Sequence, residues 1–279
     1  MAMVEVKSVW KSYPRRAGLH TEMHAVVADV SLSIEAGETM GLVGESGSGK
    51  TTLARMILGL TEPSRGSIVV DGIDVARASS ADLRRLRRQM QPVFQDPYAA
   101  LNPRMNVLQI VTEPLLIHRS AAGLNAGTGL GKRRAALRGR AVELLGSVGL
   151  DASALPRYPH EFSGGQRQRI NIARALALQP RLLILDEPVS ALDVSVGAQI
   201  VNLLRRLQRE HGLTYLFISH SMPLVRYLST RIAVMERGRL VETGEAEALC
   251  AHPAQPYTRQ LLAATPELPS AAGGPGVAV

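Results

Sequence analysis

Residues 44–52 are Gly44-Glu45-Ser46-Gly47-Ser48-Gly49-Lys50-Thr51-Thr52. They fit the phosphate-loop pattern G-x-x-x-x-G-K-[ST]. An apolar run at residues 39–43 precedes the loop and predicts a short buried strand. Apolar residues after the loop recur at the spacing of one helix face: Leu53, Met56, Ile57 and Leu60. Because strand, glycine loop and helix are the setting that this pattern requires, the stretch predicts a phosphate site.

The chemistry of the loop suits an anion. Glycines let successive backbone N–H groups point inward, and the N-terminus of the following helix adds partial positive charge. We expect Lys50 to reach the β- and γ-phosphates of a nucleotide and the Thr51 hydroxyl to bind Mg²⁺. The alternative is a Gly/Ser-rich turn that fits the pattern by accident, and the flanking strand and helix argue against it.

The composition allows a sizeable core and a basic surface. The chain has 279 residues, which suits one large domain or one with an inserted subdomain, and 46% of them are hydrophobic. The formal net charge of +8 suits nucleic acid or the anionic face of a membrane. Aromatic residues make up only 4% of the chain, so we expect no aromatic-rich basic groove and no nucleic-acid partner.

Cysteine content and hydropathy narrow the cellular setting. Cys250 is the single cysteine of the sequence, which excludes an internal disulfide and an all-cysteine cluster and fits a reducing cytosol. Residues 1–5 lack the basic and apolar regions of a signal peptide, and no apolar run approaches 18 residues. We therefore expect neither a signal peptide nor a transmembrane helix.

Strands and helices alternate along the chain, which predicts an α/β fold with a mostly parallel sheet. Apolar runs expected to form its strands lie at residues 39–43, 89–94, 181–185, 214–219, 231–235 and 239–241. A small antiparallel sheet is expected from residues 4–10, 26–34 and 67–70, with residues 11–14 (Lys-Ser-Tyr-Pro) ending its first strand. Ligands of such α/β sheets bind at the carboxyl ends of the strands. Four candidate residues fall there: Gly44, Gln95, Asp186 and His220.

The order of the elements predicts four regions. Residues 1–95 are expected to hold the antiparallel β subdomain and the first part of the nucleotide-binding core, and residues 96–162 an inserted helical subdomain. The second part of the core is expected at 163–245 and a C-terminal extension at 246–279. Residues 96–104 are expected to form a loop, residues 120–131 a mobile Gly/Ala-rich loop, and the end of the tail a disordered segment.

Two adjacent carboxylates follow the apolar strand at 181–185. At a strand end the chain turns, so Asp186 and Glu187 can face one site. Asp186 is expected to hold Mg²⁺ through water, and Glu187 to polarise the water that attacks the nucleotide. An acidic pair that merely caps a strand end is the alternative, and the phosphate loop upstream argues against it.

Further motifs resemble those of one known family. The run Phe162-Ser163-Gly164-Gly165-Gln166 resembles the ABC signature, and Tyr13, Gln95, Ser190-Ala191-Leu192-Asp193 and His220 resemble the A-loop, Q-loop, D-loop and switch histidine of ABC ATPase subunits. These motifs occur in the order and spacing of that family, from about residue 4 to residue 265. The resemblance implies a P-loop NTPase core of the ABC type.

The resemblance also implies a mechanism. ABC ATPase domains pair head to tail, so the signature residues Ser163 to Gln166 would close on the ATP held by the other subunit's phosphate loop. Tyr13 would stack on adenine, Gln95 would touch Mg²⁺ or the water and sense the transport partner, and His220 would contact the γ-phosphate. Asp193 would organise the contact between the two subunits.

Three stretches resemble one subfamily, the importers of oligopeptides, dipeptides or nickel. They are residues 93–104, 186–195 and 252–262. In that subfamily a permease inserts a short helix beside the Q-loop, and residues 97–105 would form its floor. One ATPase type there carries a C-terminal cysteine cluster that Cys250 alone cannot build, which favours pairing with a sister chain over self-pairing. Departures from the family pattern are Phe162 in the signature, Thr51 in the phosphate loop and Ser221 after the switch histidine.

The predicted function is therefore that of an ATP-hydrolysing subunit of a peptide importer, using ATP and Mg²⁺. Its expected partners are a second ABC ATPase subunit, two membrane permease subunits and, indirectly, an extracytoplasmic solute-binding protein. Its expected place is the cytoplasmic face of the inner or plasma membrane, as a peripheral subunit. Nickel, glutathione and other small solutes stay open as cargo. A soluble ABC ATPase without a permease and a protein that binds ATP without hydrolysing it are the remaining alternatives.

Overall fold

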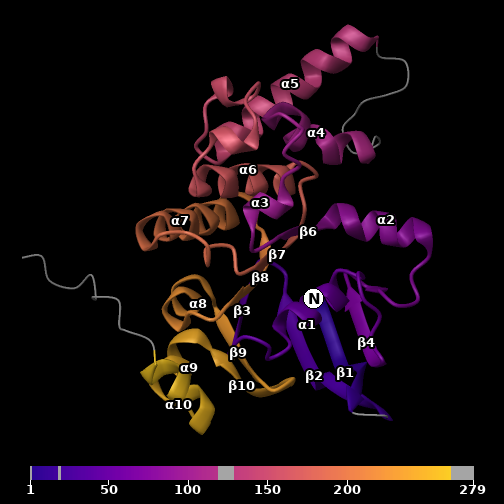
Figure 1. Cartoon of the computed structure of the whole chain (residues 1–279), viewed down its shortest axis with the longest axis vertical. Coiled ribbons are helices and arrows are strands. Elements are labelled where there is room, and N and C mark those ends of the chain that lie inside the picture. The colour runs from indigo at the N-terminus through magenta and orange to yellow at the C-terminus, as the bar shows by residue number, and fades with distance from the viewer. Residues whose placement is uncertain (1, 18–19, 119–128, 265–279) are drawn as a thin grey trace, which may run out of the picture.

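Two β-sheets organise the fold of the computed structural model, which describes residues 2–17, 20–118 and 129–264 (Figure 1). The first sheet is antiparallel and has the strand order β2-β1-β4-β5. Its strands are β1 (Ala2–Ala17), β2 (His20–Glu35), β4 (Arg65–Val70) and β5 (Ile73–Asp74). This sheet confirms the prediction of a small antiparallel layer.

One prediction for this sheet is wrong, because β1 does not end at residues 11–14 but runs on to Ala17 as part of a long hairpin with β2. Tyr13 pairs with His24 in that hairpin. Pro14 is tolerated because the pairing of β1 with β4 ends at Trp10, so the later part of β1 lies at an edge and does not need to donate to a second neighbour.

The second sheet has the order β10-β9-β3-β8-β7-β6 and confirms the mostly parallel prediction, since only β10 is antiparallel to its neighbour. Its strands are β3 (Thr39–Val43), β6 (Met90–Val93), β7 (Leu182–Asp186), β8 (Thr214–Ser219), β9 (Arg231–Glu236) and β10 (Arg239–Glu245). The register pairs Val43 with Ser219 and Asp186 with Ile218, so the carboxyl ends of β3, β7 and β8 meet at one edge.

The core has two parts because alternate strand residues face opposite sides of this sheet. On one side, Leu216 and Ile218 pack with α1 and the antiparallel sheet. On the other side, Tyr215 and Phe217 pack with the helices that cover that face. All four residues are fully buried, which explains why the parallel strands read as continuous apolar runs.

The helices fall into three groups. The first group comprises α1 (Lys50–Ile57), which follows the phosphate loop, and α2 (Ser80–Gln89), which follows the last strand of the antiparallel sheet. The second is α3 (Pro97–Ala100), α4 (Val107–Ile117), α5 (Leu130–Ser147) and α6 (Gly164–Leu176), with 3₁₀ turns at Ala152–Ala154 and Pro159–Glu161. The third is α7 (Val194–His211), α8 (Met222–Leu228), α9 (Ala246–Ala251) and α10 (Pro256–Ala263).

Two expectations about these helices are corrected. Leu60 does not lie on the buried face of α1, because the helix ends at Ile57, Gly59 turns the chain at φ 65°, and Leu60 is 56% exposed. The expected loop at 96–104 contains α3, which begins with Asp96 accepting from the Tyr98 N–H. The mobile loop expected at 120–131 and the disordered tail fall largely outside the described residues.

The second group of helices stands above the sheets in Figure 1, where α4 and α5 pack against α6. The boundary of a helical subdomain at 96–162 stays a prediction. Among the described residues, no helix combines the length and the apolar character needed to cross a bilayer.

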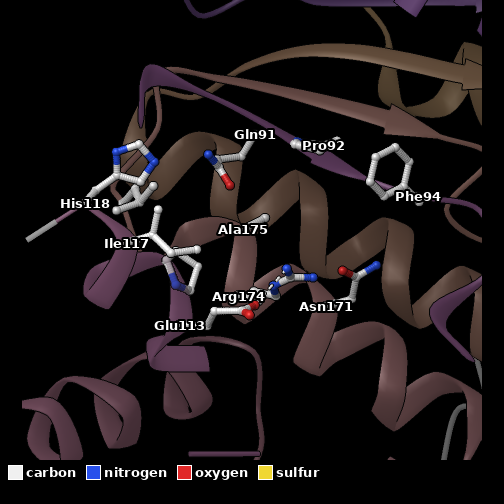
Figure 2. A pocket seen from close by; sticks show the side chains of 11 residues that line it. Gln91, Pro92, Phe94, Glu113, Ile117, His118, Asn171, Arg174 and Ala175 are labelled. Carbon is white, nitrogen blue, oxygen red and sulfur yellow. Dashed lines mark hydrogen bonds and ion pairs between the residues drawn. The ribbon is translucent and has the colours of Figure 1, made fainter. Parts of the chain in front are cut away.

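A groove of about 160 Å³ opens between β6, α4 and α6 (Figure 2). Its sides are apolar at Phe94 and Ile117, which are 41% and 68% exposed. Its floor carries an ion pair, in which Arg174 contacts Glu113 at 3.0 Å. Phe94 directly precedes Gln95, so the groove adjoins the residue that the sequence assigns to the Q-loop.

Candidate functional site

The phosphate loop lies between β3 and α1, as predicted, and its glycines are required by its shape. A Cβ on Gly44 would lie 2.1 Å from the Met235 carbonyl oxygen. Gly49 has φ +104°, and a Cβ there would lie 2.6 Å from the Val26 carbonyl oxygen. Gly47 has φ +80°, and a Cβ there would meet no atom within 4 Å, so this side of the loop is open. The loop is thus a tight backbone turn with one free side.

Lys50 closes the loop from within. Its Nζ donates to the carbonyl oxygens of Gly44 and Glu45 at 2.7 and 2.8 Å, and contacts the Ser48 hydroxyl at 3.3 Å. Burial lowers the pKa of Lys50, although the nearby carboxylates of Glu187, Asp186 and Glu45 oppose that shift. Because Nζ donates these three hydrogen bonds to neutral oxygens, a phosphate can add a charge-assisted hydrogen bond to the buried cation.

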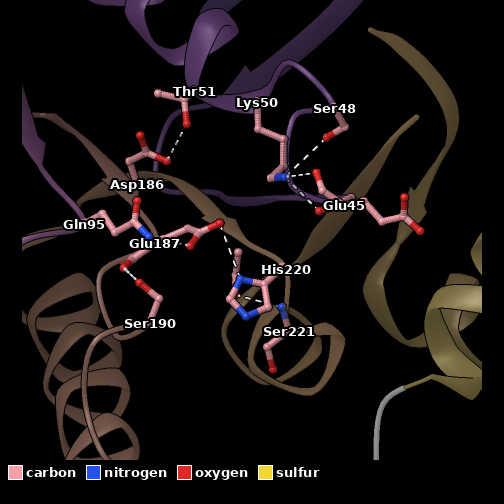
Figure 3. Close-up of polar contacts among 12 residues, drawn as sticks. Glu45, Ser48, Lys50, Thr51, Gln95, Asp186, Glu187, Ser190, His220 and Ser221 are labelled. Atoms are coloured by element: carbon pink, nitrogen blue, oxygen red, sulfur yellow. Dashed lines mark hydrogen bonds and ion pairs between the residues drawn. The ribbon is translucent and has the colours of Figure 1, made fainter. Parts of the chain in front are cut away.

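The carboxyl end of β7 brings Asp186 to the start of α1. The Thr51 hydroxyl donates to Asp186 Oδ1 at 3.3 Å (Figure 3). Burial raises the pKa of Asp186, and the Thr51 hydrogen bond only partly offsets that rise. A partly buried carboxylate beside a hydroxyl fits Mg²⁺, because hard oxygen ligands suit this ion and the ion would neutralise the buried charge.

Glu187 lies between Gln95 and His220 in Figure 3. Gln95 Nε2 donates to its Oε2 at 3.1 Å, and His220 Nδ1 lies 3.4 Å from its Oε1. The backbone of Glu187 has φ +47°, and its N–H donates to the Ile218 carbonyl oxygen on β8. That unusual conformation is held by the neighbouring strand, and it turns the carboxylate toward Gln95 and His220.

The predicted signature begins α6. Ser163 and Gln166 form a capping box, in which the Ser163 hydroxyl accepts from the Gln166 N–H at 3.3 Å and the Gln166 side chain accepts from the Ser163 N–H at 3.0 Å. A Cβ on Gly165 would lie 2.4 Å from the Val196 side chain of α7, and one on Gly164 would lie 3.1 Å from Leu192. These glycines therefore let the start of α6 approach the segment that contains Asp193.

The signature and the phosphate loop stay apart within the chain. In Figure 1, α6 lies with the upper helices and α1 lies beside the lower sheet. No hydrogen bond or ion pair found in the described part of the chain joins residues 163–166 to residues 44–52. The structure thus groups Lys50, Thr51 and the residues at the carboxyl ends of the strands, and places the signature elsewhere.

Tyr13 and Asp193 lie outside the group of residues that gathers around Lys50, Thr51 and the carboxyl ends of the strands. Tyr13 is 42% exposed on the β1–β2 hairpin, and Lys11 Nζ lies 5.1 Å from the centroid of its ring. The same hairpin passes the phosphate loop, because the Val26 carbonyl oxygen approaches Gly49. Asp193 is exposed at the N-terminus of α7. Both positions are accessible to a ligand or a second chain.

One residue at the loop was not identified from the sequence. The Tyr257 hydroxyl, on α10, accepts a hydrogen bond from the Glu45 N–H at 3.0 Å. The two residues are 212 positions apart, and no local pattern links them. Residues 252–262 carry a subfamily resemblance, which marks the segment without indicating that it reaches the loop.

Comparison of the sequence with known proteins consistently finds ABC transporter proteins and ATP-binding proteins of peptide transport. A family model described as ABC transporter matches residues 27–190. The oligopeptide transport ATP-binding protein OppF of Bacillus subtilis is 52% identical, over 86% of this chain and 76% of that protein. OppF of Streptococcus mutans is 47% identical, over 95% of this chain and 82% of that protein. A probable peptide ABC transporter ATP-binding protein of Sinorhizobium fredii, y4tS, is 48% identical, over 95% of this chain and 73% of that protein.

Solved structures agree on the fold. The ATP-binding cassette MJ0796, described as a dimer in a post-hydrolysis state bound to ADP and Pi, has a TM-score of 0.73 and 32% identity, covering 88% of this chain and 99% of that one. CbiO1 of Clostridium perfringens, described as part of the transporter complex cbiONQ, has a TM-score of 0.73 and 26% identity, covering 90% and 91%. Both matches extend well beyond the phosphate loop to nearly the whole described chain.

Proposed function

The chain belongs to the ABC transporter family of ATP-binding proteins, and from this premise we propose that it is the ATP-hydrolysing subunit of an importer of oligopeptides or dipeptides. The observation that carries the hydrolytic part is the position of Glu187, a carboxylate held between Gln95 and His220 at the mouth of the phosphate loop. The peptide part is supported by the names of the relatives, which are ATP-binding proteins of oligopeptide transport or of a peptide ABC transporter.

The residues divide the work of hydrolysis by their chemistry. Lys50 and the loop N–H groups bind the β- and γ-phosphates, since the lysine supplies positive charge and the N–H groups supply hydrogen-bond donors. Mg²⁺ would be held by Thr51 and Asp186 and would neutralise phosphate charge. Glu187 is the group proposed to accept a proton from the attacking water, because its carboxylate contacts both Gln95 and His220.

Gln95 and His220 act on the same carboxylate from two sides. Gln95 donates to Glu187 Oε2 and so orients it, while His220, with 59% of its side chain exposed, can turn from Glu187 to a γ-phosphate. Tyr13 is proposed to stack on adenine from the β1–β2 hairpin. These roles require the residues to converge on one nucleotide.

A second ABC ATPase chain is proposed to complete the site. The signature residues 163–166 open a helix, where N–H groups and the helix dipole favour an anion, and they lie apart from this chain's own loop. A partner's phosphate loop facing this signature would enclose ATP between two chains, and Asp193 would lie at that contact. The dimeric cassette among the similar structures supports pairing, and the lone Cys250 favours a sister chain.

The groove shown in Figure 2 is the proposed binding site of a permease helix. Phe94 and Ile117 offer apolar surface in the groove, and Phe94 directly precedes Gln95. A helix inserted there would therefore contact the chain beside the residue proposed to sense the transport partner. Burial lowers the pKa of His118 at one end of the groove, with Arg88, Arg84 and Arg87 lowering it further. That cationic end suits an acidic residue on the permease. The chain would thus sit peripherally at the cytoplasmic membrane face and serve a solute-binding protein indirectly.

Membrane co-purification tests this proposal. The tagged full-length chain, expressed in its native host, is expected to sediment with membranes together with two permease subunits. Ile117→Asp in the groove is expected to abolish this association and to leave ATP hydrolysis by the purified chain within about twofold. Leu60→Asp is the matched control, since Leu60 is also exposed but lies away from the groove, and it should behave as the wild type.

The outcomes separate the alternatives. Wild-type chain that hydrolyses ATP but never sediments with membranes would favour a non-transport ABC ATPase. If Ile117→Asp stays on membranes, the proposed docking site is refuted and the proposed ATPase function is not. Cargo is tested separately, by uptake of labelled di- and oligopeptides against nickel and glutathione in cells that lack the chain.

A further inference from the structure

The C-terminal segment around α10 is fastened to the nucleotide-binding core. Glu242, on β10, accepts hydrogen bonds from the Ala254 and Gln255 N–H groups at 2.8 and 3.1 Å, just before α10 begins. Arg259 donates to the carbonyl oxygens of Pro253 and Ala254 at 2.9 and 3.0 Å. The turn into α10 is therefore fixed from both sides, which gives this helix a defined position next to β10 (Figure 1).

This position places the hydroxyl of Tyr257 at the phosphate loop. Tyr257 is in the first turn of α10, and its ring packs against the core while its hydroxyl accepts from the Glu45 N–H at 3.0 Å. Burial raises the pKa of Tyr257 above its ordinary value of 10.0, so the hydroxyl keeps its proton at neutral pH. The loop is thus contacted by a segment beyond the last strand of the sheet.

The bonded N–H belongs to a peptide unit that also holds Lys50. Glu45 N–H and the Gly44 carbonyl are the two ends of one planar peptide, and Gly44 O accepts from Lys50 Nζ at 2.7 Å. Because the peptide is rigid, fixing the direction of its N–H fixes the direction of its C=O. The chain of contacts runs from Tyr257 through the 44–45 peptide to Lys50.

We infer that Tyr257 is a positioning residue for nucleotide binding, which holds the 44–45 peptide and thereby pre-organises the phosphate loop and Lys50. The C-terminal extension is then part of the nucleotide site rather than an appendage to it. This inference rests on the proposed function, in which the loop binds ATP. Because a pre-organised loop loses less conformational freedom on binding, removal of the hydroxyl weakens binding while the reacting groups at Glu187 stay in place.

Tyr257→Phe tests the inference with little risk to folding, since it keeps the packed ring and removes only the hydroxyl. We expect KM for MgATP and the equilibrium Kd to rise about 2- to 10-fold, the range for one hydrogen bond, with kcat within about twofold. Tyr227→Phe is the control, because its hydroxyl donates to Asn202 at 2.7 Å and contacts no residue of the loop. It should leave both constants unchanged.

Hydrogen exchange gives a second readout that needs no nucleotide. The Glu45 amide is expected to exchange faster in full-length Tyr257→Phe than in the wild type, and at the wild-type rate in Tyr227→Phe. Unchanged KM and Kd in Tyr257→Phe, or a fall in kcat without a rise in Kd, would overturn the inference. If the wild-type chain itself fails to bind ATP, the proposed function fails instead, so the two failures are distinct.

Discussion

Replacement of Glu187 by Gln isolates the proposed base from the rest of the site. The substitution keeps the length and volume of the side chain and removes its negative charge. The remaining amide oxygen can still accept from Gln95 Nε2, which now lies 3.1 Å from Oε2. The backbone bond from residue 187 to Ile218 is unaffected, so the strained φ of +47° is held as before.

The expected magnitudes differ sharply between stability and catalysis. Glu187 is partly buried, with 18% of its side chain exposed, and one weakened contact there changes the free energy of unfolding by about 1 kcal/mol. Loss of a positioned general base slows a reaction by about 10²- to 10⁴-fold, which corresponds to roughly 3–5 kcal/mol in the activation barrier. ATP binding depends on Lys50 and the loop, so its Kd is expected to stay within about threefold.

The assay is steady-state phosphate release at saturating MgATP, together with equilibrium binding of a fluorescent ATP analogue. Both are measured on the purified chain and on the assembled complex. Glu210→Gln is the control, because Glu210 forms an exposed ion pair with Arg206 on α7 and its loss should change neither rate nor affinity. Hydrolysis by Glu187→Gln above about one tenth of the wild-type rate would refute the role given to this carboxylate.

Two further predictions concern stability in the absence of nucleotide. Gly49→Ala is expected to lower the free energy of unfolding, measured in urea, by about 2–4 kcal/mol, because residue 49 has φ +104° and the new Cβ would meet the Val26 carbonyl oxygen. Gly47→Ala places its Cβ in open space and should lower that free energy by only about 1–2 kcal/mol, so equal losses in the two variants would contradict this account. Asp186→Asn is expected to be more stable than the wild type at pH 7, because burial raises the pKa of Asp186 in the folded state above 3.8 and the charged carboxylate therefore destabilises the fold. The gain in stability should shrink as the pH is lowered through that raised pKa, and the absence of a gain at pH 7 would contradict the prediction.

The parts of the fold that could be predicted from the sequence are those with local signals. The phosphate loop, β3 and the buried face of α1 carry a motif, an apolar run and a helical spacing within about 20 residues. The meeting of Gln95, Asp186 and His220 at one edge also follows from a general rule, since each lies within two residues of the carboxyl end of a strand of the parallel sheet.

The errors arise where a distant partner overrides a local pattern. Residues 11–14 contain a proline and look like a strand end, yet β2 provides enough pairing to carry β1 to Ala17. Leu60 fits the spacing of α1, but Gly59 ends the helix before it. The contact between Tyr257 and Glu45 depends on the whole sheet being in place, so no window of sequence could indicate it.

The strand order has a consequence for how the protein is made. β3 lies between β8 and β9, and Val43 pairs with Ser219 and Val234, which follow it by 176 and 191 positions. The strand beneath the phosphate loop therefore has no sheet neighbour until most of the chain has been synthesised. At about 5–20 residues per second, that delay is on the order of 10–30 s after β3 leaves the ribosome. The antiparallel hairpin and α1 form from nearby residues during this time. A nascent chain that stops before residue 214 therefore carries the complete phosphate-loop sequence but cannot assemble the site.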